Sequence, residues 1–162
     1  MAICVYPGSF DPVTKGHINI IERASKIFDK VYVLVSTNTK KHYLFSIEEK
    51  IRMLEKSLHI KNVEIAHTEG MVVAFAQEKG ASVILRGIRN PNDYQNELEI
   101  SYFNHSIDPN IETMLMYADR DNLFTSSSSI KELILCEGDA HPFLPEEIAE
   151  EVIQKIKNQP ND

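Results

Sequence analysis

The sequence predicts an α/β fold with one five-stranded parallel sheet that is doubly wound and carries helices on both faces. Five short apolar or β-branched runs alternate along the chain with segments whose apolar residues recur at helical spacing. No internal repeat or linker interrupts this alternation. Successive right-handed crossovers make the strands parallel and give a Rossmann-like sheet, whose ligand lies at the carboxyl ends of the strands where their order reverses.

Length and composition indicate one compact unit. A chain of 162 residues, 43% of them apolar, is long enough for one core and too short for two ordinary domains. We therefore expect residues 1–162 to form a single domain, with 158–162 as a frayed tail. The apolar runs fall far below the roughly 20 residues that span a bilayer, and no secretory signal is evident, so we expect a cytoplasmic protein without membrane contact.

Charge and metal-ligand patterns exclude some classes of function. A formal net charge of −7 argues against a general nucleic-acid binder, which usually has a basic face. The six histidines show no metal-ligand spacing, so we expect no protein-held metal. Cys4 and Cys136 lie in apolar segments, which favours core positions for both over a disulfide or a nucleophile.

The first strand, loop and helix form a candidate phosphate site. Residues 2–6 are apolar, and Pro7 with Gly8 ends this run. Thr14 to His17 opens a helix whose apolar face is expected to hold Ile18, Ile21, Ala24 and Phe28. Gly8 and Gly16 bracket the loop and allow close approach of backbone to a ligand. The free amides and positive dipole end of the helix suit phosphate.

The other elements follow from their own patterns. Strands are expected over Lys30–Ser36, 62–67, 82–86 and 112–118. Helices are expected from Ser46, over 70–79 before Gly80, over 93–107, from the serines of 126–129 to Gly138, and over 146–157. Ser46 with Glu49, and Ser129 with Glu132, are candidate capping boxes. Residues 87–92 are predicted to be a loop.

Cations gather just beyond the predicted strand ends. Loops on the opposite edge are mixed or acidic, so the pattern favours a polyphosphate binder over the alternative that loops are simply polar. Gly87 between two arginines suggests a sharp strand exit with bidentate phosphate donors beside it. The cations are Lys15, Lys40, Lys41, Arg86, Arg89, Arg120 and Lys131.

Four motifs in order resemble one known family. Gly8-Ser-Phe-Asp-Pro-Val-Thr-Lys-Gly-His17 is neither a Walker loop nor a G-x-G-x-x-G loop. It resembles the H/T-x-G-H motif of the nucleotidylyltransferase superfamily, in the form found in the phosphopantetheine adenylyltransferase family. Three later segments are also similar to that family: Asn38 to Lys41 before Phe45, Arg86 to Arg89 before Asp93-Tyr94 and Glu97, and Ser127 to Glu132.

The resemblance implies a role for each matching residue. The implied catalytic residues are His17, Lys41 and Arg89. The implied ATP-binding residues are Ser9, Phe10, Thr14, His17, Gly87, Ile88, Arg89, Glu97 and Leu123, Phe124, Thr125, Ser126, Ser127, Ser128 and Ser129, although Leu123 to Ser126 departs from the family pattern. The implied acceptor-binding residues are Ser9, Lys41, Val72 and Arg86. From the residues alone, Glu97 could instead be a buried partner of an arginine, Val72 a core residue, and Lys40 the active lysine in place of Lys41.

The resemblance also implies a reaction and an assembly. ATP and 4′-phosphopantetheine would give dephospho-coenzyme A and pyrophosphate, with Mg²⁺ held mainly by the ATP phosphates, in a homohexamer. The residues show no nucleophile beside a base, so the acceptor phosphate itself would attack the α-phosphorus. Two alternatives are a nucleotidylyltransferase for another acceptor, such as nicotinamide mononucleotide, and a non-catalytic nucleotide sensor. Rates, preferred direction and feedback by coenzyme A lie beyond sequence reasoning.

Overall fold

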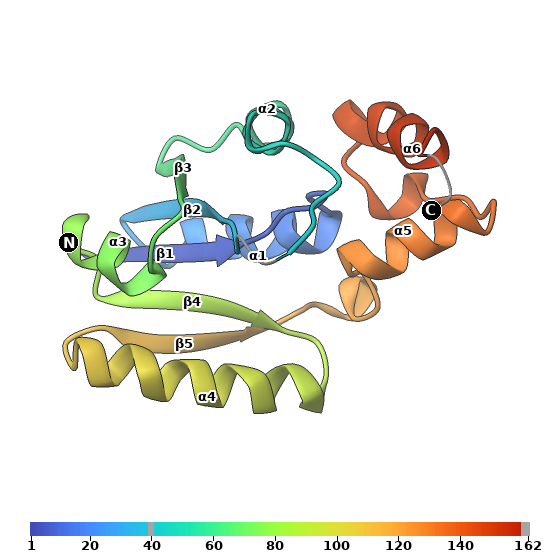
Figure 1. The fold of residues 1–162 in the computed structure, drawn as a ribbon. Helices are drawn as coiled ribbons and strands as arrows, with labels where there is room; N and C mark the ends of the chain where they lie inside the picture. The colour runs from blue at the N-terminus through green and yellow to red at the C-terminus, as the bar shows by residue number, and fades with distance from the viewer. Residues whose placement is uncertain (39–40, 160–162) are drawn as a thin grey trace.

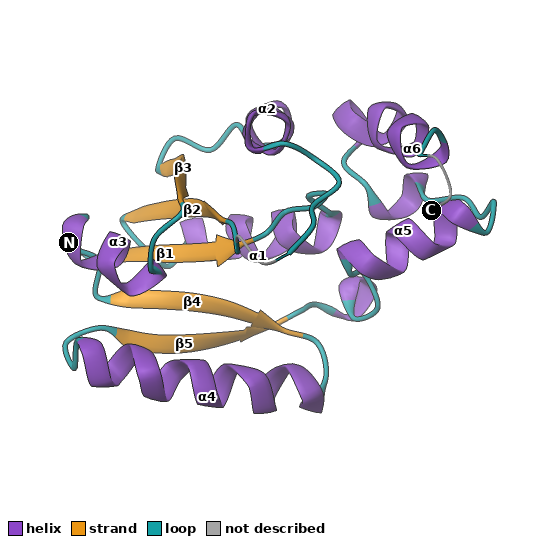
Figure 2. Ribbon diagram, viewed as in Figure 1, coloured by secondary structure: helices purple, strands orange, loops and turns teal. Residues whose placement is uncertain are grey.

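The fold is a five-stranded parallel sheet, as the alternation of elements predicts. The computed structural model describes residues 1–38 and 41–159, and the expected frayed tail lies partly outside these ranges. The strand order is β3-β2-β1-β4-β5, so it reverses between β1 and β4 (Figure 2). The strands are β1 (Ile3–Gly8), β2 (Lys30–Ser36), β3 (Val63–Thr68), β4 (Val83–Ile88) and β5 (Glu112–Tyr117).

Helices cover both faces of the sheet and its carboxyl edge. Figure 1 shows α5 and α6 beyond the carboxyl ends of the strands, and α4 alongside β5. The helices are α1 (Lys15–Ser25), α2 (Ile47–Ser57), α3 (Val72–Glu78), α4 (Pro91–Ile107), α5 (Ser127–Leu135) and α6 (Ala149–Lys157), with short 3₁₀ turns at Arg120–Asn122, His141–Phe143 and Glu146–Ile148. None of the helices within the described ranges is long and apolar enough to cross a bilayer.

Alternation along the strands divides the buried side chains into two cores. Cys4 and Tyr6 of β1 pack with α1, α2, α5 and α6 in the larger core. Val5 of the same strand points the other way and packs with Val73 and Ala76 of α3. Because successive strand side chains alternate between faces, one sheet buries an apolar surface on each side and stays fixed relative to all its helices.

Capping residues set the start of two helices as the sequence predicts. Ser46 accepts a hydrogen bond from the Glu49 amide, and Glu49 accepts one from the Ser46 amide, which completes the capping box of α2. Gly80 follows α3 with φ of 63°, a left-handed conformation that glycine adopts at low cost. Helix α1 ends at Ser25, so Phe28 lies beyond it, although its side chain is buried as expected.

Strand β4 is longer than its apolar run suggests, and the predicted loop over residues 87–92 is wrong. Gly87 and Ile88 pair with Met116 and Tyr117 of β5, so the strand continues past the first arginine. Asn90 then caps α4, which begins at Pro91 because proline fits the first helical position and needs no amide partner there. The connection between β4 and α4 is therefore very short.

Two further expectations at the carboxyl-terminal end are also wrong, whereas the last helix over 146–157 is confirmed, with its first turn, Glu146–Ile148, in 3₁₀ geometry directly before α6. Ser126, not Ser129, caps α5, so the Ser129–Glu132 capping box does not form and Ser129 lies inside the first turn. Cys136 is exposed after α5, whereas Cys4 is buried; both thiols are free.

Candidate active site

His17 lies in the first turn of α1, and the residue that caps this helix fixes its ring. The Thr14 hydroxyl accepts a hydrogen bond from the His17 amide at 3.3 Å, and the Thr14 amide donates to His17 Nδ1 at 3.0 Å. Because a backbone N–H can only donate, Nδ1 is the unprotonated nitrogen of the neutral ring. The neutral imidazole therefore carries its hydrogen on Nε2 and can offer it to a ligand.

The surroundings of His17 keep the ring neutral. Burial, and secondarily the positive charge of Arg89, lowers the pKa of His17 to about 4. The Phe10 ring meets the imidazole edge to face, with 5.0 Å between ring centroids. At neutral pH the side chain is thus an uncharged hydrogen-bond donor and not a cation.

Phe10 sits in a strained conformation that the loop after β1 enforces. Its φ is 46°, which a bulky residue rarely adopts, and its side chain is fully buried between Tyr6 and His17. A Cβ on Gly8 would lie 2.9 Å from the Phe10 ring, so glycine is required there. Since the Phe10 ring is enclosed, only the backbone of this residue is available to contact a nucleotide.

Arg89 connects three neighbouring hollows at the carboxyl edge of the sheet. The first hollow is lined by Tyr6, Gly16, His17, Ile20, Gly87, Arg89, Ala118, Asn122 and Thr125. The second is lined by Ile88, Arg89, Asn90, Pro91, Tyr94 and Tyr117, and the third by Arg89, Asn90, Leu123, Phe124, Ser126 and Ser129. Asp93 accepts hydrogen bonds from the Arg89 amide and Nε at 2.9 and 3.2 Å, which holds the guanidinium at this junction.

The serine cluster forms the amino-terminal end of α5 beside the third hollow. Ser126 Oγ accepts a hydrogen bond from the Ser129 amide at 3.0 Å and lies 2.6 Å from Ser129 Oγ. Ser127 Oγ donates to the Pro12 carbonyl at 2.7 Å, which attaches α5 to the loop after β1. Ser128 is exposed. The helix end thus presents amides and hydroxyls toward the same edge as His17.

Arg86 and Glu97 form a bidentate ion pair. Arg86 Nε and Nη2 each donate to a Glu97 carboxylate oxygen at 2.7 Å, and Nη1 donates to the Pro7 carbonyl at 3.1 Å. Glu97 is 7% exposed and is the one buried residue of α4. Glu97 is therefore the partner of an arginine in the structure, which is the alternative that the sequence left open.

The remaining predicted site residues lie around this edge without lining the three hollows. Ser9 is exposed between β1 and Phe10, and Lys41 is exposed in the segment after β2. Val72 begins α3 and packs partly buried against the smaller core, as its apolar character suggests. Lys40 lies outside the described residues. The structure thus brings His17, Arg89 and the serine end of α5 together around the hollows, whereas Lys41 and Val72 do not line them.

Sequence reasoning missed two features of the site. Tyr117 lines the second hollow because β5 lies beside β4 and ends next to Ile88, a placement that the predicted strand ends could have indicated. Asp11 is buried at 3% exposure and receives Lys131 Nζ at 2.6 Å. Lys131 therefore points to a carboxylate, whereas the sequence predicts it among the cations gathered for a polyphosphate.

Comparison with known proteins places the chain in a family. The family model for cytidylyltransferase-like proteins matches residues 5–133. A phosphopantetheine adenylyltransferase of Clostridium novyi (strain NT) is 42% identical over 96% of this chain and 98% of its own. One of Clostridium botulinum (strain Eklund 17B / Type B) is 41% identical over 97% of this chain and 99% of its own.

Solved structures share the fold. A putative nicotinate-nucleotide adenylyltransferase from Vibrio parahaemolyticus superposes with a TM-score of 0.65 at 16% identity, covering 96% of both chains. A nicotinic acid mononucleotide adenylyltransferase from Plasmodium falciparum, complexed with NaAD, superposes with a TM-score of 0.66 at 15% identity, covering 96% of this chain and 94% of that one.

The family match and the curated relatives show that the chain is a nucleotidyltransferase enzyme. The chain belongs to the cytidylyltransferase-like family and, within it, to the phosphopantetheine adenylyltransferases.

Proposed function

We propose that the protein transfers the adenylyl group of ATP to 4′-phosphopantetheine and forms dephospho-coenzyme A and pyrophosphate. One observation carries this proposal: the neutral His17 donor and Arg89 line one hollow at the point where the strand order reverses, and the serine end of α5 borders a second hollow that Arg89 shares. The names of relatives about 40% identical over nearly the whole chain supply the acceptor.

The chemistry needs positioned donors more than a protein nucleophile. An oxygen of the acceptor phosphate attacks the α-phosphorus of ATP, and the bond from that phosphorus to the bridging oxygen breaks, with its electron pair leaving on pyrophosphate. His17 Nε2–H and the Arg89 guanidinium would stabilise the negative charge that develops on the phosphate oxygens. His17 donates a hydrogen bond throughout and keeps its proton, which its lowered pKa permits.

The two substrates would divide the edge of the sheet between them. The proposed ATP contacts are Ser9, Phe10, Thr14, His17, Glu97, Gly87 to Arg89 and Leu123 to Ser129. Most residues of the last two ranges line the three hollows. The acceptor contacts are Ser9, Lys41, Val72 and Arg86. Since Arg86 is bound to Glu97, the acceptor phosphate would share the guanidinium with that carboxylate, using donor positions that the pair leaves open.

Mg²⁺ is proposed as the metal of the reaction. Within residues 1–38 and 41–159 no group of three or more His, Cys, Asp or Glu side chains is arranged to hold an ion. We propose that the phosphates of ATP mainly hold this ion, where it would neutralise charge on the triphosphate.

We further propose a cytoplasmic homohexamer. Apart from Glu97, no side chain of α4 is buried, and several of its large apolar residues are exposed. A surface of this kind indicates a protein interface. The exposed apolar residues of α4 and the adjoining strand β5 are Tyr94, Leu98, Ile100, Tyr102, Phe103, Ile107, Met114 and Tyr117.

Pyrophosphate release with a panel of acceptors tests the proposed reaction. The purified protein is mixed with ATP, Mg²⁺ and either 4′-phosphopantetheine, nicotinamide mononucleotide or no acceptor. We expect release with phosphopantetheine alone. Release with the mononucleotide would assign a different acceptor, and an absence of release in every mixture, with ATP bound, would identify a nucleotide sensor.

A further inference from the structure

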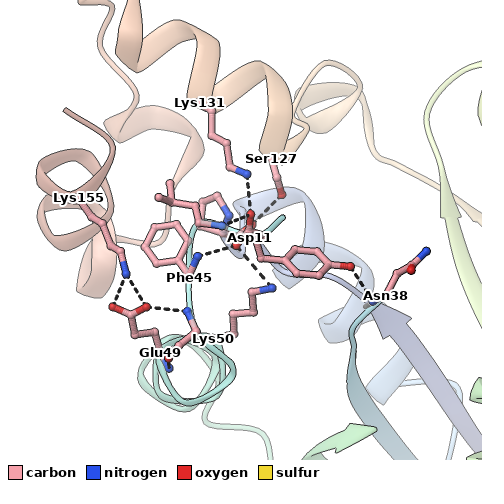
Figure 3. Close-up of polar contacts among 12 residues, drawn as sticks. Asp11, Asn38, Phe45, Glu49, Lys50, Ser127, Lys131 and Lys155 are labelled. Carbon is pink, nitrogen blue, oxygen red and sulfur yellow. Dashed lines mark hydrogen bonds and ion pairs between the residues drawn. The ribbon is translucent and has the colours of Figure 1, made fainter. Parts of the chain in front are cut away.

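Asp11 is a buried carboxylate that joins three separate segments of the site (Figure 3). It lies in the loop between β1 and α1, and its oxygens accept hydrogen bonds from the amides of Leu44 and Phe45 at 3.1 and 2.9 Å. Lys131 Nζ from α5 donates to it at 2.6 Å, and Lys50 Nζ from α2 lies 3.5 Å away. One carboxylate thus faces two ammonium groups and two amides.

The contact with Lys50 extends to the segment that carries Lys41. The Lys50 side chain is fully buried, and its Nζ lies 3.7 Å from the centre of the Tyr43 ring. Tyr43 Oη accepts a hydrogen bond from the Asn38 amide at 2.9 Å, and the Asn38 carbonyl accepts one from the Lys41 amide at 2.9 Å. The segment after β2 is therefore attached to Asp11 through its backbone and through an aromatic ring.

The contact with Lys131 fixes the serine end of α5. Lys131 lies one turn into α5 after Ser127, whose hydroxyl is bound to the Pro12 carbonyl next to Asp11. Burial opposes ionisation of Asp11, but the hydrogen bonds from Lys131, Phe45 and Leu44 outweigh it and lower the pKa of the carboxyl below its ordinary value. Asp11 is thus held as an anion between the two halves of the site.

We propose that Asp11 is a positioning residue for adenylyl transfer, which binds Lys131 and Lys50 and so holds the serine end of α5 and the Lys41 segment in the relative placement that the transition state requires. This inference rests on the proposed function. Misplacing reacting groups by about 1 Å costs on the order of 100-fold in rate, so loosening either attachment should lower kcat.

The principal test is Lys131→Met compared with Lys30→Met. Lys30 is a matched control: its Nζ also makes a 2.6 Å ion pair, with Glu64, and both lysine side chains are 30% exposed, but Lys30 begins β2, away from the site. We expect Lys131→Met to lower kcat about 10- to 100-fold with the KM for ATP changed less than about threefold, and Lys30→Met to leave both near wild type. Equal kcat values in the two variants would overturn the proposal.

A double-mutant cycle separates positioning from direct contact between Lys131 and a phosphate. If Lys131 acts through Asp11, Asp11→Asn and the double variant Asp11→Asn/Lys131→Met should have the same kcat within about threefold. Rate losses that multiply would show that Lys131 works independently of Asp11 and would overturn the inference. Lys131→Arg keeps the positive charge and should recover most of the activity.

Hydrogen exchange reports the attachment without any turnover. In Lys131→Met, the amides of Leu44 and Phe45 should exchange roughly fivefold faster than in wild type, while amides of β3 keep their rates. Unchanged exchange at both amides would contradict the proposal even if Asp11→Asn fails to fold. If the wild-type protein releases no pyrophosphate, the proposed function is refuted. Hydrogen exchange does not require turnover, so it still tests the attachment through Asp11.

Discussion

At the scale of single residues, the chemistry depends on which nitrogen of His17 holds the proton. The Thr14 amide occupies Nδ1, so Nε2–H is the donor available to a phosphate oxygen. A charged imidazole could not accept the hydrogen bond from the Thr14 amide, because both of its nitrogens carry a proton and can only donate. The low pKa and the capping contact therefore support the same role, that of a preorganised neutral donor.

His17→Ala should lower turnover far more than substrate binding. Removing one preorganised donor to a developing charge typically costs about 10²- to 10³-fold in rate, or roughly 3 kcal/mol. Steady-state kinetics should show this loss in kcat with KM values near wild type. An unchanged kcat in the purified, folded variant would refute the role of His17.

The pH dependence of stability should report the depressed pKa of His17. The pKa of His17 is about 4 in the folded state against the ordinary value of 6.5, so the unfolded chain takes up this proton first as pH falls. The free energy of unfolding should therefore decrease between about pH 6.5 and 4, by up to about 3 kcal/mol from this group, and no further below pH 4.

The control for that measurement is His17→Asn, which lacks the titrating group. Denaturant melts at pH 7 and pH 4.5 should show a smaller loss of stability in the variant than in the wild type. The imidazole signals of His17 in NMR spectra should also stay those of the Nε2–H tautomer down to about pH 5. A titration midpoint near 6.5 would contradict the neutral ring.

At the scale of secondary-structure elements, helix ends supply the phosphate donors. The amino-terminal ends of α1 and α5 both lie at the carboxyl edge of the sheet, and each is capped by a hydroxyl side chain, Thr14 or Ser126. Capping leaves other amides of the first turn free to meet an anion. The caps therefore stabilise the helices and shape the site at once.

Ser126→Ala and Ser46→Ala form a pair that separates these two effects. Each removes an N-cap and should lower the free energy of unfolding by about 1 kcal/mol, measured in urea. Only Ser126 borders the hollow beside Arg89, so only Ser126→Ala should also raise the KM for ATP. A raised KM in the Ser46 variant instead would mean that the site extends to α2.

Strong local signals made most elements predictable, and the failures have physical causes. The capping box of Ser46 and the β-branched run of β2 need only neighbouring residues, and both were predicted correctly. The extension of β4 through Gly87 depends on pairing with β5, which is a tertiary contact that local pattern cannot contain. The cap of α5 was misplaced because several consecutive serines offer equivalent caps.

The same distinction applies to the site. His17, Arg89 and the serines stand in local motifs beside strand ends, so the sequence could place them at one edge. A pairing of Glu97 with an arginine is one of the alternatives that the sequence leaves open, and Arg86 is that arginine. The partners of Asp11, by contrast, include residues that lie 33 and 120 positions further along the chain. Long-range contacts of this kind follow from how α5 and the segment before α2 dock, and no local spacing indicates them.

At the scale of the whole molecule, α4 presents an apolar surface beside β5 that one chain does not cover. Tyr102 is 71% exposed and Phe103 56% exposed, although both carry large rings. A hexamer that buries this surface would remove about 25 cal/mol of unfavourable hydration for each Å² of apolar area. Association should therefore stabilise the fold as well as assemble it.

Tyr102→Glu should disrupt the oligomer, because it places a charge within the proposed interface. Sedimentation velocity should show the wild type as a hexamer and the variant as smaller species. Ile27→Glu is the control, since Ile27 is 62% exposed but lies after α1, away from α4. A monomeric wild type would contradict the interface.

The central claim is that the acceptor phosphate attacks ATP directly, in one site at the carboxyl edge of the sheet. Exchange of labelled pyrophosphate into ATP tests it, because a protein–adenylyl intermediate would allow exchange without an acceptor. With Mg²⁺ and ATP alone we expect no label in ATP, and we expect exchange once 4′-phosphopantetheine is added. Exchange in the absence of any acceptor would contradict direct transfer, and no exchange with phosphopantetheine present would contradict the proposed reaction itself.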